Sequence, residues 1–231
     1  MKNIILIIIL FIAIPFFTRS QTFNYDQLGI EVGAGSGGMR VGNADIHRSF
    51  SYRAGAFVTD IKTARIWFTE TGLFYESTGA NMKGFLPGVY SGYVRDIDLR
   101  TSYFTTQIMV GLFKKELITG TGIYMALRVG TYLSLGLNSH ANITGIDSNG
   151  AIFSKDIADA FKEEKFTEAG VEYVFEPFAR NDFGAKYALD FGYKQLSLRI
   201  TVTAGFIKLH PSYDKKFNTG NVFFSLGYVL C

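Results

Sequence analysis

The clearest regularity in the chain is an alternation of hydrophobic and polar residues between Ile118 and Leu137. Odd-numbered positions carry aliphatic residues or threonine, whereas even-numbered positions are mostly small or polar and include Arg128. Successive side chains of a β-strand point to opposite faces, so this segment predicts a strand with one apolar and one polar face. Strands in soluble sheets have about 5–6 residues. The greater length favours a strand that crosses a membrane with its apolar face toward lipid.

The same two-residue period recurs in seven further segments, each near or above the about 9–11 residues that a tilted membrane strand needs. The eight predicted strands are 28–37, 50–60, 66–77, 99–113, 118–137, 182–193, 196–209 and 221–230. The links between them alternate between short (61–65, 114–117, 194–195) and long (38–49, 78–98, 138–181, 210–220). Bacterial outer-membrane barrels alternate in this way between periplasmic turns and extracellular loops. We therefore predict an all-β fold, an eight-stranded antiparallel up-and-down transmembrane β-barrel with long extracellular loops.

The first 20 residues have the features of a secretory signal peptide. Lys2 precedes an apolar run that ends at Phe17, and the small residues Thr18 and Ser20 suit cleavage before Gln21. An uncleaved anchor helix is the alternative, although the run is shorter than the ~18 apolar residues expected of a spanning helix. We expect residues 21–231 to form the mature barrel domain in the bacterial outer membrane.

The longest predicted connection, 138–181, is long enough to hold structure of its own. Ser154 can cap a short helix that runs to Lys165, with Ile157 and Phe161 one turn apart on one face. Residues 167–178 predict either a ninth strand or a hairpin above the membrane. We favour the hairpin, because a ninth spanning strand would break the even count of such barrels.

Composition narrows the classes of function. Loss of Lys2 and Arg19 with the signal peptide leaves 21 basic against 20 acidic residues, so net charge does not indicate a nucleic-acid partner. The only cysteine is Cys231, which excludes a disulfide framework. Neither metal-binding histidine spacing nor a phosphate-binding loop occurs, and we predict no catalytic, cofactor-binding or metal-binding residues.

Eight charged residues fall on the predicted inward faces: Glu31, Arg53, Glu70, Glu76, Arg128, Lys186, Asp190 and Arg199. Four are acidic and four are basic. Side chains fill the interior of an eight-stranded barrel, and an unpaired buried charge costs several kcal/mol. These residues therefore predict a charge-paired network that plugs the lumen, with a narrow ion or water path as the alternative. Phe68 and Phe74 share the inward face of their strand and fit a polar lumen less well.

Three histidines fall just beyond predicted strand ends on the long-loop side, each with a serine nearby in the sequence. The pairs are His47 with Ser49, His140 with Ser139, and His210 with Ser212. A serine and a histidine at the rim would suit a lipid-modifying enzyme if they lay within hydrogen-bond reach. Neighbouring positions in the sequence do not ensure that geometry, so we predict no enzymatic activity and keep the enzyme as an alternative.

Three runs rich in glycine and aromatic residues carry a family resemblance. They are Thr71 to Ala80 (TGLFYESTGA), Asn181 to Ala185 (NDFGA) leading to Asp190-Phe-Gly-Tyr193, and Phe224 to Tyr228 (FSLGY). Residues 21–230 resemble the outer-membrane β-barrel domain family of Bacteroidetes-type bacteria, sometimes called PorT-like. The resemblance implies an eight-stranded outer-membrane barrel, usually of unassigned function. The chain departs from the family at its end, where Val229-Leu230-Cys231 follows Tyr228 in place of a final aromatic residue.

The sequence thus predicts an integral outer-membrane protein that acts as a non-enzymatic anchor or interaction element. Its partners would be outer-membrane lipid around the barrel and an unidentified protein or envelope component at the extracellular loops, and no nucleic acid. A narrow pore or a component of a secretion apparatus is the second hypothesis, and a lipid-modifying enzyme at the outer rim is the third. A soluble lipocalin-like barrel is the structural alternative, but its interior should be apolar.

Overall fold

A computed structural model describes residues 27–41, 45–60, 67–83, 93–118, 121–147, 149–168, 170–207 and 217–230. These residues form eleven strands: β1 (Gln27–Val41), β2 (Asp45–Asp60), β3 (Trp67–Lys83), β4 (Tyr93–Ile118), β5 (Ile123–Ile146), β6 (Ile152–Ile157), β7 (Glu164–Glu168), β8 (Val171–Phe175), β9 (Asn181–Tyr193), β10 (Leu196–Gly205) and β11 (Phe217–Val229). None of the described residues belongs to a helix long and apolar enough to span a membrane. The predicted signal peptide lies outside the described residues.

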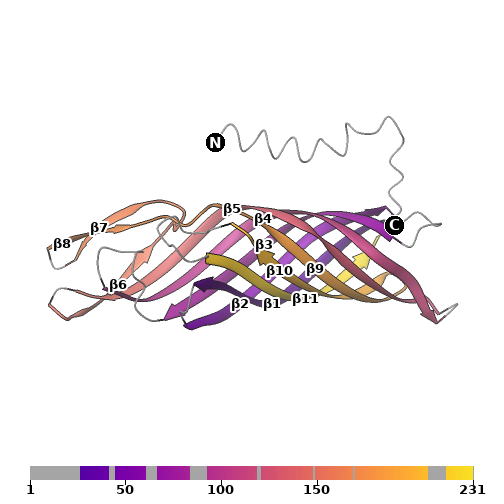
Figure 1. The fold of residues 1–231 in the computed structure, drawn as a ribbon, viewed down its shortest axis with the longest axis horizontal. Helices are drawn as coiled ribbons and strands as arrows, with labels where there is room; N and C mark the ends of the chain where they lie inside the picture. Colours follow the sequence, from indigo (N-terminus) through magenta and orange to yellow (C-terminus); the bar gives the residue numbers. More distant parts are fainter. Residues whose placement is uncertain are drawn as a thin grey trace, which may run out of the picture.

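Eight of these strands close into a barrel (Figure 1). The hydrogen-bonded order runs from β4 through β3, β2 and β1 to β11, β10, β9 and β5, and β5 pairs again with β4. All of these pairings are antiparallel. Gly29 near the start of β1 lies opposite Val229 at the end of β11, so the barrel begins and ends at one rim. The predicted eight-stranded antiparallel barrel is confirmed.

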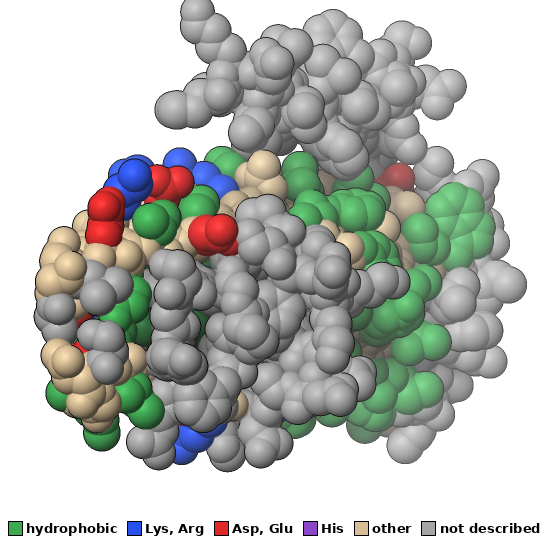
Figure 2. Space-filling view, turned by 60° about the vertical axis from the view of Figure 1, so that its left-hand side comes forward, with side chains coloured by type: hydrophobic (Ala, Val, Ile, Leu, Met, Phe, Trp, Pro, Cys, Tyr) green, Lys and Arg blue, Asp and Glu red, His purple; other side chains and the backbone are tan. Residues whose placement is uncertain are grey.

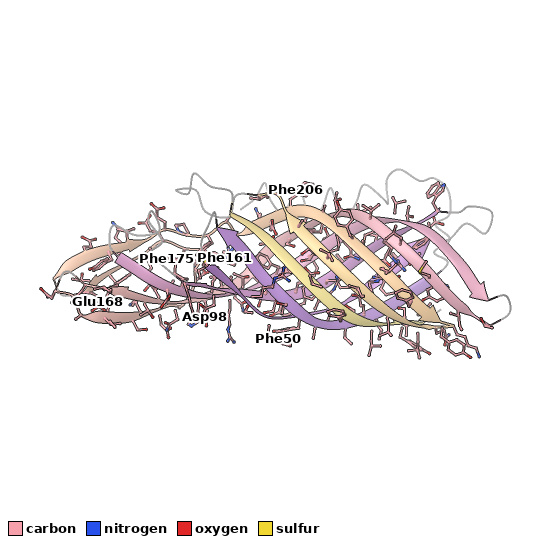
Figure 3. All side chains as sticks on the ribbon, turned by 60° about the horizontal axis from the view of Figure 1, so that its bottom comes forward. Phe50, Asp98, Phe161, Glu168, Phe175 and Phe206 are labelled. Carbon is pink, nitrogen blue, oxygen red and sulfur yellow. The ribbon has the colours of Figure 1, made fainter. Side chains whose placement is uncertain are left out.

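The barrel continues at its other end into a smaller body, which we call the external lobe. It consists of β6, β7 and β8 together with the adjoining ends of β3, β4 and β5. β6 pairs with the end of β5, from Ala141 opposite Ile157 to Ile146 opposite Ile152. β7 and β8 form a separate hairpin (Figure 1). Figure 3 labels Glu168, which marks the tip of that hairpin at the far end from the barrel turns.

The external lobe has a hydrophobic core made by both of its layers. The sheet contributes Met82, Leu99, Ile143 and Ile157, among others, and the hairpin contributes Phe166, Tyr173 and Phe175. The rings of Phe153, Phe166 and Tyr173 lie 5.4–6.3 Å apart. A core of this kind excludes water from both layers, so the hairpin is fixed on the sheet.

The predicted strand from Ile118 to Leu137 is wrong at both ends. Ile118 ends β4 and lies opposite Ile123, so the chain turns between them, and Gly122 has a φ of 72°. Thr121 and Gly122 lie in this turn, although their sequence continues the alternation of the strand. At the other end the strand continues to Ile146. Leu137 has no opposite residue on β4, and this bulge reverses which positions face inward. The sequence alternation therefore breaks at Leu137 although the strand does not end there.

The predicted helix from Ser154 to Lys165 is also wrong. Ser154 lies within β6, and residues 164–168 form β7. The free edge of β5 offers this segment a full ladder of backbone hydrogen bonds, which outweighs the local capping signal. Residues 167–178 include the β7–β8 turn and all of β8, which confirms a hairpin outside the barrel rather than a ninth barrel strand.

Candidate functional site

The outer surface of the barrel is apolar. Leu198 and Val129 are among the large hydrophobic side chains that remain exposed, at 60% and 42%. Figure 2 shows hydrophobic side chains gathered over the barrel, whereas charged ones lie toward the external lobe. A soluble protein seldom exposes an apolar patch larger than a few hundred Å². A continuous belt around a closed sheet is the surface that lipid requires.

Aromatic side chains lie at both rims of this belt. At the turn end these exposed residues are Trp67, Phe191, Tyr193 and Tyr228. At the lobe end they are Phe50, Tyr52, Tyr75, Phe183 and Phe206. The Phe183 and Phe206 rings lie 6.0 Å apart, and the Tyr52 ring lies 6.1 Å from Tyr75. In Figure 3, Phe50 and Phe206 project from opposite sides of the barrel. Two aromatic girdles are typical of barrels that span a membrane.

The lumen is filled by charged side chains around Glu70. This carboxylate is fully buried and accepts hydrogen bonds from Arg199 at 2.9 and 3.1 Å and from Gln107 at 2.9 Å. It also accepts a hydrogen bond from Arg128. Glu70 comes from β3, whereas Arg128 and Arg199 come from β5 and β10. The carboxylate therefore joins strands on opposite sides of the barrel.

Asp190 and Glu31 complete the partners of these two arginines. Asp190 accepts a hydrogen bond from Arg128 Nε at 2.7 Å and another from Arg199 Nε at 2.7 Å. Arg199 Nη1 also donates to Glu31 at 2.6 Å. Charge-assisted bonds of this number and length hold both guanidinium groups in place inside the barrel.

A second group of charges lies toward the external lobe and is joined to the first. Lys186 Nζ donates to Glu76 at 2.9 Å and to Gln107 at 3.0 Å. Arg53 lies between the groups, with Nε 3.2 Å from Glu31 and Nη1 3.7 Å from Glu76. The structure thus brings all eight charged residues predicted for the lumen into one buried network.

Aromatic rings cover the faces of the buried cations. The guanidinium carbon of Arg53 lies 4.0 Å from the centre of the Phe74 ring, and that of Arg128 lies 4.8 Å from the Phe68 ring. Gly111 opposite Phe68 leaves room for that ring, since a Cβ there would fall 2.0 Å from it. The inward phenylalanines are therefore part of the charge network through cation–π contacts. This charged interior differs from the apolar interior that the lipocalin-like alternative requires.

A polar cluster that the sequence pattern did not indicate lies at the lobe end of the lumen. The buried carboxylate of Asp182 accepts hydrogen bonds from Tyr132 Oη at 2.8 Å and Thr219 Oγ1 at 2.6 Å. Two residues after Thr219 on β11, Asn221 Oδ1 accepts a hydrogen bond from Thr78 Oγ1 at 2.6 Å. Asp182 shares the even-numbered inward face of Lys186 and Asp190. The two-residue period could have identified it, although it stands at the end of the predicted strand.

The rim histidines do not form a serine–histidine site among the described residues. Ser139 faces inward, where its Oγ donates to Asp159 at 3.1 Å, whereas His140 is exposed on the outer face beside Asp156 at 3.5 Å. The side chains of His47, His210 and Ser212 lie outside the described residues. Within the described part of the chain, no group of three or more His, Cys, Asp or Glu residues could hold a metal ion.

The segment between β6 and β7 is fixed to the barrel wall by Asp159. Its carboxylate accepts hydrogen bonds from Ser139 Oγ and from the backbone N–H of Phe161 at 3.2 Å, and lies 3.1 Å from Lys162 Nζ. Burial raises the pKa of Asp159, but the donors from Lys162, Phe161 and Ser139 outweigh burial and lower it overall. The Phe161 ring packs edge-on against Tyr103 at 6.1 Å, at the lobe end of the lumen.

Comparisons with known proteins include a solved structure whose fold is similar to this one. No family model matches the chain, and no curated protein matches it. The crystal structure of Neisserial surface protein A is similar over 87% of this chain and 96% of that chain, with 10% sequence identity and a TM-score of 0.45.

Proposed function

We propose that this chain is an integral outer-membrane protein whose barrel anchors the external lobe at the cell surface. The observation that carries the proposal is the reversal of the usual arrangement of side chains. Charged groups such as Glu70 and Arg199 are buried inside the barrel, whereas residues such as Leu198 and Phe224 are exposed outside it. In this orientation the tight turns face the periplasm and the lobe lies outside the cell.

The same proposal includes a non-enzymatic role as an interaction element. Support comes from the external lobe, which has a core of its own and is held to the barrel through Asp159 and Ser139. A rigid lobe presents a binding surface at low entropic cost. The opposite directions of Ser139 and His140 give a rim hydrolase no support.

We also propose membership of the Bacteroidetes-type, PorT-like barrels. The runs that resemble this family lie in barrel strands: Thr71 to Ala80 in β3, Asn181 to Tyr193 in β9, and Phe224 to Tyr228 in β11. Their glycine and aromatic positions therefore fall where an outer-membrane barrel needs small lumen residues and lipid-facing rings.

Cysteine labelling on intact cells tests the orientation. In a Cys231→Ser background, a cysteine in place of Glu172 on β8 should react with a membrane-impermeant maleimide. A cysteine in place of Gln195, in the exposed turn between β9 and β10, should react only after the outer membrane is permeabilised. Equal reaction of both cysteines in intact cells would exclude this orientation.

Photo-crosslinking tests the interaction role. A photo-crosslinking amino acid at Glu172 should give a discrete adduct in living cells, whereas the same amino acid at Gln195 should not give that adduct. A variant in which residues 147–179 are replaced by a short turn should lose the adduct and still migrate as a heat-modifiable barrel. If lobe positions crosslink only to lipid, the lobe is not an interaction element.

The filled lumen predicts that the protein does not conduct ions. The wild type should give no channel activity in planar bilayers, because Glu70, Arg128 and their partners are buried and bonded to one another across the lumen. A double variant with Glu70 and Arg128 changed to alanine serves as the comparison, since it removes side chains from the centre of the network. Reproducible unitary currents from the wild type would favour the pore hypothesis instead.

A further inference from the structure

The last strand of the sheet has one unpaired edge. β6 pairs with β5 along six residues, and no described strand pairs with its other side. The Asp147 N–H bonds to the Ala151 carbonyl at 2.9 Å, which marks that pair as hydrogen-bonded. Because antiparallel pairs alternate, the backbone N–H and C=O of Ser154 then point away from β5. β6 therefore presents backbone donors and acceptors at the end of the molecule outside the membrane (Figure 1).

This edge lacks the usual protection against pairing. Natural edge strands are commonly guarded by proline, bulges or exposed lysine. β6 contains no proline and pairs with β5 in continuous register. Its single lysine, Lys155, lies 3.5 Å from Glu164 and 5.5 Å from the centre of the Phe166 ring. Ile152 at the start of the strand is 66% exposed. The edge is thus open to an added strand.

The charge of residues 138–180, which supply β6, the β7–β8 hairpin and the end of β5, indicates what kind of strand would bind. Residues 138–180 contain eight acidic and four basic residues, namely Asp147, Asp156, Asp159, Glu163, Glu164, Glu168, Glu172 and Glu176 against Lys155, Lys162, Lys165 and Arg180. Asp156 belongs to β6 itself and is held by Asn142 Nδ2 at 2.8 Å. Pairing of two copies through β6 would bring two acidic 138–180 segments together, which electrostatic repulsion disfavours.

We propose that β6 binds an extended, lysine- or arginine-rich segment of a partner protein by strand addition. The inference rests on the proposed interaction role of the lobe and names the site and the chemistry of the partner. Backbone hydrogen bonds along β6 would supply affinity. The acidic side chains, Asp156 foremost, would select cationic residues at alternate positions of the added strand.

Peptide binding to the full-length protein in detergent micelles tests the proposal. The probe is a fluorescent peptide of about six residues, the length of β6, in which lysine alternates with threonine. We expect binding in the micromolar range by fluorescence anisotropy. The same peptide with glutamate for lysine should bind about tenfold more weakly or worse, as should a peptide N-methylated on the edge that faces β6.

Two pairs of variants localise the binding. Ser154→Pro removes an outward N–H without removing a bond to β5, so it should weaken binding about tenfold, whereas Ser154→Ala should bind as the wild type does. Asp156→Asn should weaken the lysine peptide several-fold. Glu172→Gln, a charge loss on the hairpin, should have a smaller effect. Heat-modifiability and circular dichroism confirm that each variant is folded.

Three outcomes would overturn the proposal. One is equal binding of the N-methylated and unmodified lysine peptides, which would show attraction by charge alone. Another is equal binding by Ser154→Pro and Ser154→Ala. The third is a dimer that Ser154→Pro dissociates, which would make a second copy the occupant. Photo-crosslinks from Glu172 that persist despite any of these results would leave the interaction role intact without strand addition.

Discussion

We expect Glu70→Ala to lower the free energy of unfolding of the membrane-inserted barrel by about 3–5 kcal/mol. Glu70 is fully buried and bonds to Arg128, Arg199 and Gln107. Its removal leaves two guanidinium groups in the lumen with only Asp190 and Glu31 as acidic partners. Removal of one member of a buried ion pair is costly because the remaining charge is neither hydrated nor fully compensated.

Urea titration of protein refolded into lipid vesicles would measure this loss. The single tryptophan, Trp67, lies exposed on the outer face of β3 and reports unfolding by fluorescence. Glu70→Gln keeps a hydrogen-bond acceptor and should cost less than the alanine variant. Glu172→Gln, on the exposed hairpin, should stay within about 0.5 kcal/mol of the wild type.

A double variant shows whether the network acts as a unit. Glu70→Ala combined with Arg128→Ala removes one charge of each sign, so it should cost less than the sum of the two single variants. A strictly additive result, or a Glu70→Ala variant as stable as the wild type, would mean that water rather than Glu70 compensates these arginines.

The eight charged lumen residues were predictable because the two-residue period is unbroken in the parts of the strands that carry them. A shift of one position would move Arg128 or Asp190 from the lumen into lipid, so the alternation assigns each residue to one face. The pairs themselves were not all predictable. Arg199 lies opposite Asp190 on the neighbouring strand, which the hairpin register gives directly. Its bonds to Glu70 cross the lumen from β10 to β3 and depend on how far the closed sheet is sheared.

Local sequence patterns did not predict most of the strands of the external lobe. Ser154 is a residue type that commonly caps helices, yet its Oγ donates to Asn142 Oδ1 on the adjacent strand β5 at 3.2 Å. That contact exists only because β5 continues past the bulge at Leu137, and a bulge leaves no clear mark in the composition of the strand. The inward position of Phe74 does not fit a polar lumen by sequence alone, whereas in the structure its ring covers the buried Arg53.

The lipid-facing surface gives the second large effect. We expect Val129→Arg to destabilise the barrel in lipid vesicles by about 2–4 kcal/mol, because it places a charge near the middle of the membrane on the outer face of β5. Val129 is exposed to the same degree as its cross-strand neighbour Val110, and Tyr187 flanks it on β9. Within the protein, none of these neighbours offers an acidic partner.

A matched variant on the same strand and face separates a membrane effect from a general loss of packing. Leu137 is 48% exposed at the lobe end of the belt, where an arginine can reach water and headgroups. Leu137→Arg should therefore cost only about 0–1 kcal/mol. Val129→Ala controls for loss of the valine side chain and should destabilise the barrel less than Val129→Arg does.

The difference in unfolding free energy between the two arginine variants shows whether hydrocarbon surrounds the middle of β5 but not its lobe end. A soluble barrel would leave Val129 and Leu137 equally hydrated, and arginine at either position would then have a small effect. Equal costs in vesicles would therefore contradict a spanning barrel, even if both variants were destabilised. A large cost at Val129 alone requires that water is excluded from the middle of β5 and present at Leu137, which only a bilayer of finite thickness around the barrel provides.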